Sequence, residues 1–163
     1  MIRLRPAQGA DRFRLRRWLD DPALPLWWGT SSSVEAEIAM ALEAHNPYLT
    51  IIEKDAQPVG IALAADAAML GGVDRPATVE AGTYAIDVFV ALPETRAADS
   101  TAAIALAAAE VFATSFAIAC CSLVSIKSEP VARAYERAGF TWREIWHDRY
   151  RGPCWVMLLP RPR

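Results

Sequence analysis

The sequence contains only three cysteines, Cys120, Cys121 and Cys154, and two of them are adjacent in an apolar run. An odd number with this spacing fits neither a disulfide framework nor a metal-binding motif. We therefore expect buried or half-buried thiols, a reducing compartment and no metal site. The first residues, Met-Ile-Arg-Leu-Arg-Pro, lack the apolar core of a secretion signal, so the cytoplasm is the expected location.

The sequence also lacks a large excess of either positive or negative charge. The formal net charge is −2 and the pI is about 5.7, so bulk electrostatics gives no reason to expect nucleic acid as a partner. Six arginines crowd the N-terminal segment: Arg3, Arg5, Arg12, Arg14, Arg16 and Arg17. They indicate a solvated helix face, and a phosphate-binding rim is the alternative.

Repeats, low-complexity tracts and linkers are absent from the 163 residues, which predicts one domain over residues 1–163. With 53% hydrophobic residues, this domain can bury a sizeable core. From Thr101 to Ile126 the one charged residue is Glu110, and this run is long enough to span a bilayer. Because much of it is weakly apolar alanine, we expect a buried helix that runs into a buried strand, and no membrane span.

Hydrophobic periodicity and turn residues predict alternating strands and helices. Strands are expected over residues 2–4, 48–53, 59–65, 84–92, 120–126, 142–147 and 154–159. Helices are expected over residues 10–19, from Ser32 onward, after Pro93 and over 130–138. Ser32 and Glu35 form a predicted capping box, and Gly139 a predicted left-handed helix stop. Residues 66–82 form an irregular excursion around Gly71 and Gly72. This order is typical of a mixed α/β domain.

Three motifs resemble one known family. Residues 128–140, Ser-Glu-Pro-Val-Ala-Arg-Ala-Tyr-Glu-Arg-Ala-Gly-Phe, are similar to a late helix written Asn-x-x-Ala-x-x-x-Tyr-x-x-x-Gly-Phe. The strand over 86–90, followed by Pro93-Glu94-Thr95-Arg96 and a long helix, resembles a strand and pyrophosphate loop that bind acetyl-CoA. Leu4-Arg5-Pro6 and Trp27-Trp28-Gly29 narrow the match. The chain thus resembles the GNAT acetyltransferases, in the branch of the aminoglycoside 6′-N-acetyltransferases and siderophore-precursor acyltransferases.

The resemblance implies a mixed, mostly antiparallel sheet flanked by helices, and roles for particular residues. Tyr135 would be the acid for the leaving thiolate; the alternative is a tyrosine packed in the core with its hydroxyl bonded. The backbone of Phe89 and Val90 would line the pantetheine, with Val90 N–H as oxyanion donor. Asp87 would bind or deprotonate the amine; the alternative is a solvated carboxylate on the strand face. Ser128 takes the place of the motif's asparagine.

The expected pyrophosphate loop departs from the family pattern. The cofactor-binding positions that the resemblance implies are Arg96, Ala97, Ala98, Asp99, Ser100 and Thr101. Asp99 and Thr101 replace two small residues, and a carboxylate at contact distance repels a pyrophosphate. Three outcomes remain open: acetyl-CoA binds weakly, Asp99 points away from it, or the cofactor site is defunct.

The expected function is acetyl-CoA-dependent transfer to a primary amine of a small molecule, either aminoglycoside-like or an amino-acid derivative. Trp28, Asp87 and Asp148 are the expected substrate-binding residues. Arg149 and Arg151 flank the turn after Asp148, where a polycationic substrate needs acidic groups. One alternative is a non-catalytic domain that binds a ligand or partner, and another is a siderophore-precursor acyltransferase. A homodimer is compatible with the family.

Overall fold

A seven-stranded sheet forms the centre of the molecule, with the strand order β1-β2-β3-β4-β5-β7-β6. The computed structural model describes residues 1–69, 75–149 and 151–163, so Gly71 and Gly72 lie outside the described residues. The strands are β1 (Ile2–Pro6), β2 (Leu49–Lys54), β3 (Gln57–Asp66), β4 (Thr83–Val90), β5 (Ala119–Ser125), β6 (Thr141–Asp148) and β7 (Gly152–Pro160).

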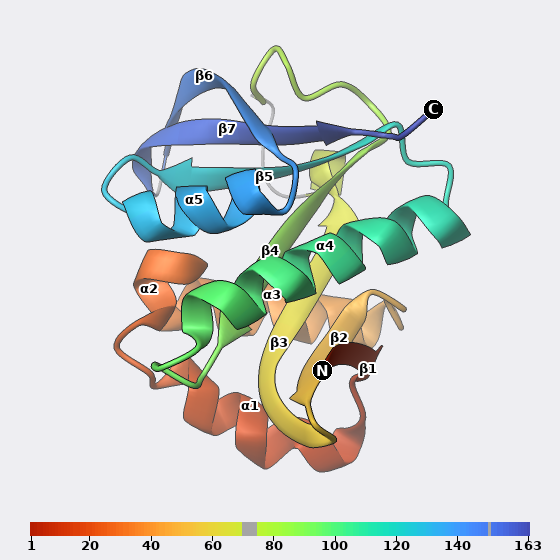
Figure 1. The fold of residues 1–163 in the computed structure, drawn as a ribbon, viewed down its shortest axis with the longest axis vertical. Helices are drawn as coiled ribbons and strands as arrows, with labels where there is room; N and C mark the ends of the chain where they lie inside the picture. Colours follow the sequence, from red (N-terminus) through yellow and green to blue (C-terminus); the bar gives the residue numbers. More distant parts are fainter. Residues whose placement is uncertain (70–74, 150) are drawn as a thin grey trace.

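All neighbouring strands pair in antiparallel fashion except β4 and β5, which are parallel. This parallel pairing is short: Thr83–Ala85 lie beside Ala119–Cys121, and beyond them the two strands diverge. Figure 1 shows the two halves of the sheet separating from this point. The predicted mixed, mostly antiparallel sheet is therefore confirmed, and it has a built-in opening.

Five α-helices flank the sheet: α1 (Arg12–Leu19), α2 (Leu24–Trp27), α3 (Ser31–Glu43), α4 (Arg96–Thr114) and α5 (Glu129–Arg137). In Figure 1, α4 crosses in front of the sheet, with α5 beside it, and α3 lies behind. By length and composition α4 is apolar enough to cross a membrane. Its apolar side, which includes Ala103, Ile104 and Val111, is buried against the sheet. Together with β5, α4 is the buried helix and strand that the sequence predicts.

Local details of the helices correct three expectations. The second predicted helix begins at Ser31, and its N-cap is Thr30, whose hydroxyl accepts the Ser33 N–H at 3.4 Å; the predicted capping box from Ser32 is wrong. The short helix α2 was not expected. The helical spacing of the first helix predicts Phe13 on the same apolar side as Leu15 and Trp18, but Phe13 is 89% exposed. The predicted left-handed stop at Gly139 is confirmed by its φ of 102°.

Several of the crowded arginines near the N-terminus, Arg3, Arg5 and Arg16 among them, pair with acidic side chains. Arg5 donates to Asp11 and to Glu53, both at 2.8 Å, and Arg3 bonds the same Glu53. Arg16 pairs with Glu35 on α3. These pairs support the surface interpretation over a phosphate-binding rim.

Candidate functional site

One edge of β4 faces the opening beside β5. Successive residues of a strand direct their main-chain N–H and C=O groups to opposite edges, so every second residue of β4 directs these groups into the opening. Ala64, which lies opposite Ile86, donates its N–H to Tyr48 on its other side, so the main chain of Ile86 faces away from β3. Every second residue of a strand has the same direction, so the main chains of Val88 and Val90 also face the opening. The main chain of Phe89 faces β3 instead. The main chain of Val90 therefore faces the opening, as a residue that lines the pantetheine would. The main chain of Phe89 does not, and Val88 has the orientation that was expected of Phe89.

Side chains of the protein bond three carbonyl groups along this opening. The Tyr135 hydroxyl donates to Ile86 O at 2.7 Å, and Arg96 Nε donates to Val90 O at 2.6 Å. From the other side, an Arg151 N–H donates to Leu123 O on β5 at 2.8 Å. These three carbonyls freed by strand divergence are thus satisfied, as buried polar groups require, while the N–H groups of Val88 and Val90 keep their orientation toward the opening.

Arg96 is held by the sheet and not extended toward a ligand. Its guanidinium lies over the Phe89 ring, 5.3 Å from the centroid, and 3.6 Å from Asp21. Arg96, which the resemblance implies as a pyrophosphate-binding residue, therefore contacts the end of β4 and Asp21 in this structure.

Tyr135 lies on α5 with its hydroxyl in the opening. The side chain is fully buried and packs edge-on against Phe140, with 5.2 Å between ring centroids. Burial raises the pKa of the Tyr135 phenol, so it carries its proton at neutral pH. This is the geometry of the packed-core alternative, in which the hydroxyl proton is donated to Ile86 O at the opening.

Asp99 lies in the first turn of α4, where its carboxylate already has partners. Its carboxylate bonds Lys54 Nζ at 3.0 and 3.2 Å and accepts the Thr95 hydroxyl at 2.5 Å. Both Asp99 and the neighbouring Ser100 are buried, and Thr101 bonds Ala97 O. The negative charge therefore stays in the first turn of α4, where Lys54 matches it. The three outcomes that the sequence leaves open stay predictions.

We therefore expect Asp99→Asn to lower the free energy of unfolding by about 1–3 kcal/mol, because it removes hydrogen bonds between charged groups that are partly buried. Affinity for acetyl-CoA should stay within about two-fold of wild type, since Lys54 and Thr95 already bind the Asp99 carboxylate and weaken its effect on the helix N-terminus. Chemical denaturation and calorimetry measure the two quantities. Lys54→Met is the matched variant, and the double variant should cost less than the sum of the singles. A large gain in affinity for Asp99→Asn would contradict this placement.

Two cavities lie beside α5, one toward β5 and one toward α4. The first, about 430 Å³, lies between α2, β5 and the start of α5, and Ser128 is part of its lining. The second, about 280 Å³, is lined by Ala97 of α4 and by Glu129, Pro130, Arg133 and Arg137. Ala98 is exposed beside them. The expected cofactor residues are therefore split: Ala97 and Ser128 line cavities, whereas Asp99 and Ser100 face the core.

A third cavity, here called the acidic cavity, lies on the opposite side of the opening and has a volume of about 470 Å³. Three carboxylates and one guanidinium line it: Glu37, Asp87, Asp148 and Arg151. It shares Gly29, Thr30, Leu123 and Arg151 with the cavity beside α2, so the two spaces adjoin. The predicted pair Asp87 and Asp148 is thus brought together, about 60 residues apart in sequence.

Trp28 lies behind this cavity. Its side chain is buried, and its indole N–H donates to Glu37 Oε2 at 2.8 Å. Trp28 therefore orients a carboxylate, and Glu37 is the residue that sequence reasoning missed. The overlooked signal is the row of polar residues on the helix that follows the Trp-Trp-Gly segment, which includes Glu37.

Asp87 is 9% exposed, so the alternative of a solvated strand-face carboxylate is wrong. Burial raises its pKa to about 7; the positive charge of Arg151 opposes this shift, and the negative charge of Glu37 adds to it. A carboxylate that titrates near neutral pH is suited to accept a proton from an amine.

The cysteines have no such activation. Burial raises the pKa of the Cys120 and Cys121 thiols to about 12 and that of Cys154 to about 11. They remain thiols at neutral pH and are poor nucleophiles.

Comparison with known proteins identifies the fold. No family model and no curated protein sequence matches the chain. An aminoglycoside acetyltransferase, AAC(6')-Ib, solved with coenzyme A, is 21% identical with a TM-score of 0.81, over 99% of this chain and 95% of that one. The aminoglycoside N(6')-acetyltransferase of Legionella pneumophila is 14% identical with a TM-score of 0.73, over 98% and 91%. Spermidine N-acetyltransferase from Vibrio cholerae, solved with CoA and spermine, is 11% identical with a TM-score of 0.71, over 98% and 95%. The chain therefore has the fold of the GNAT acetyltransferases, as its sequence motifs predict.

Proposed function

We propose that this protein transfers an acetyl group from acetyl-CoA to an amine of a small molecule. The observation that carries the proposal is the position of Asp87, a buried carboxylate with a pKa near 7. It lies where the acidic cavity meets the opening between β4 and β5. Proteins with this fold have been solved with coenzyme A and kanamycin, and with CoA and spermine, which supports the choice of reactants.

The described residues fit acetyl-CoA, which would supply an activated acetyl thioester. The main chain of Val88 and Val90 faces the opening and would line a pantetheine arm, with the Val88 N–H as a donor to one of its amides. The N-terminus of α4 offers N–H groups without partners inside the helix, which suits a pyrophosphate. Lys54 matches the charge of Asp99, so repulsion of the pyrophosphate is reduced.

Each residue then has one task in the transfer. Asp87 accepts the proton that the amine loses as the new C–N bond forms. Val90 donates its N–H to the carbonyl oxygen, where negative charge develops. Tyr135 gives its hydroxyl proton to the sulfur as the C–S bond breaks, and this proton first leaves its hydrogen bond to Ile86 O. The raised pKa keeps the phenol protonated until then. The amine attacks directly, so the buried cysteines are not needed as nucleophiles.

The acceptor that best matches the acidic cavity is cationic before it reacts. Glu37, Asp87 and Asp148 outnumber Arg151, so an ammonium group is attracted. Three carboxylates already surround the Arg151 guanidinium, which leaves less of its charge for a carboxylate on the acceptor. We therefore favour a simple amine over an amino-acid derivative or a siderophore precursor.

Glu37→Gln should raise the KM for the amine about ten-fold and change kcat little, because it removes one negative charge that holds the acceptor. Trp28→Phe, which removes the hydrogen bond that orients Glu37, should act in the same direction with a smaller effect. Glu35→Gln is the matched control, since Glu35 lies on the same helix but pairs with Arg16 at the surface. Equal KM values for all three variants would remove Glu37 from the acceptor site.

Incubation with acetyl-CoA and single amines tests the proposal directly, with release of the free thiol and mass spectrometry of the product as readouts. The panel includes kanamycin, spermine, ornithine and a hydroxylamine derivative of ornithine. We expect N-acetylation of at least one amine, abolished in Asp87→Asn. Acetyl-CoA binding without transfer to any amine would instead favour the non-catalytic binding domain.

A further inference from the structure

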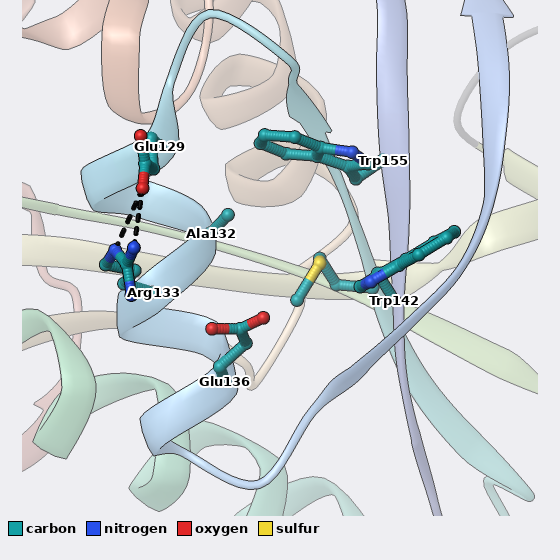
Figure 2. A pocket seen from close by; sticks show the side chains of 7 residues that line it. Glu129, Ala132, Arg133, Glu136, Trp142 and Trp155 are labelled. Carbon is teal, nitrogen blue, oxygen red and sulfur yellow. Dashed lines mark hydrogen bonds and ion pairs between the residues drawn. The ribbon is translucent and has the colours of Figure 1, made fainter.

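A groove lies between α5 and the last two strands, outside the acidic cavity. Its volume is about 460 Å³, and it is lined by Glu129, Ala132, Arg133, Glu136, Trp142, Trp155 and Met157. We call it the indole groove. In Figure 2, Ala132 and Glu136 lie on the side of α5 nearer the two tryptophans of β6 and β7, whereas the paired Glu129 and Arg133 lie farther from them. Ala132 and Glu136 are four residues apart, which places them on a single helix face.

The two indoles give this groove an aromatic wall. Trp142 is 57% exposed, although tryptophan is usually mostly buried, and Met157 is buried beneath it. The face of an indole carries negative electrostatic potential and attracts cations more strongly than the other aromatic side chains.

The charged residues of the groove are unequally matched. Arg133 bonds Glu129 at 2.6 and 3.1 Å, so that pair neutralises itself. The Glu136 carboxylate has no hydrogen-bond or ion-pair partner among residues 1–69, 75–149 and 151–163, although its main-chain carbonyl accepts the Gly139 N–H. The groove therefore has two indoles beside one carboxylate whose charge is not compensated.

We propose that the indole groove binds a small organic cation, with an alkylammonium or quaternary ammonium group held between Glu136 and the indoles of Trp142 and Trp155. Cation–π attraction and the carboxylate charge act in the same direction on such a group. An anion would meet the opposite potential. This site does not depend on the proposed acetyl transfer.

Titration with tetramethylammonium, which cannot be acetylated, tests the proposal. The readout is the indole N–H signals of the 15N-labelled full chain, assigned with Trp142→Phe and Trp155→Phe. We expect saturable shifts of these two signals in the millimolar range. Glu136→Gln and Trp142→Ala should each weaken binding at least about three-fold. Glu43→Gln is the charge-matched control, because Glu43 is exposed at the far end of α3.

Shifts that stay linear with concentration would overturn the proposal. An equal loss of affinity in Glu43→Gln would also overturn it, because bulk charge would then explain the binding. The same holds if acetyl-CoA moves the Trp142 and Trp155 signals and tetramethylammonium does not. In that case the groove would extend the neighbouring cavity, with which it shares Glu129 and Arg133.

Discussion

Replacing Asp87 with asparagine is expected to lower kcat/KM for acetyl transfer by about 10²–10⁴-fold, the range for loss of a general base. Asparagine keeps the size and polarity of the side chain but cannot accept the proton of the amine. Steady-state kinetics with an accepted amine measure the effect. A fall of less than about ten-fold would remove Asp87 from the chemistry, and the proton would then have to leave by another route.

The pH dependence separates loss of a base from general damage. Because the pKa of Asp87 is about 7, wild-type kcat/KM should rise with pH up to about 7, as the carboxyl loses its proton. Asp87→Asn should lose this acid limb, and its low residual rate should not depend on pH in that range. An unchanged acid limb in the variant would assign the titration to another group.

The free energy of unfolding provides a control, because it should fall with rising pH over the range in which kcat/KM rises. The pKa of Asp87 rises from 3.8 to about 7 on folding, so the folded state holds a proton that the unfolded state has lost between these values. Stability therefore falls as pH rises from about 4 to 7, by a contribution on the order of 4 kcal/mol. Asp87→Asn should match wild type near pH 4 and be more stable at pH 8. A variant that is both inactive and unstable at pH 8 would contradict this assignment.

The second large effect is expected for Tyr135→Phe, with kcat lower by about 10²-fold and affinity for acetyl-CoA changed much less. The change removes the acid and leaves the ring packed against Phe140. It also leaves Ile86 O without its donor, at a cost of about 1–3 kcal/mol in unfolding free energy. Kinetics and denaturation of the same samples measure both.

A thioester with a more acidic leaving thiol separates the two interpretations of Tyr135. If the phenol protonates the sulfur, Tyr135→Phe should lose far less rate on such a thioester than on acetyl-CoA. Phe140→Leu is the packing control, because it disturbs the same ring contact and keeps the hydroxyl. Equal losses on both thioesters would assign Tyr135 to packing alone.

The fold was largely predictable because local patterns determine it. The alternation in β4, the apolar run of α4 and β5 and the stop at Gly139 all depend on neighbours in sequence. The helix α2 has four residues, too few for a periodic signal. Phe13 is exposed although it lies among apolar positions, since periodicity gives the face of a helix and not what covers it.

The site was less predictable because its decisive contacts are long-range. Lys54 and Asp99 are 45 residues apart, and no local pattern indicates that the lysine matches the carboxylate. The main-chain direction of Phe89 depends on which residues of β3 lie opposite β4, a register that the sequence does not specify. Burial of Asp87 likewise results from the approach of α3 and of the turn that carries Arg151.

Calorimetric titration of acetyl-CoA into the wild-type protein tests the central claim most directly. The account predicts a single site with micromolar affinity, because Lys54 compensates Asp99 and the opening between β4 and β5 is preformed. Asp99→Gly should bind no more tightly. Absence of binding by wild type at millimolar acetyl-CoA, or binding that appears only in Asp99→Gly, would contradict the account and identify a scaffold whose cofactor site is closed.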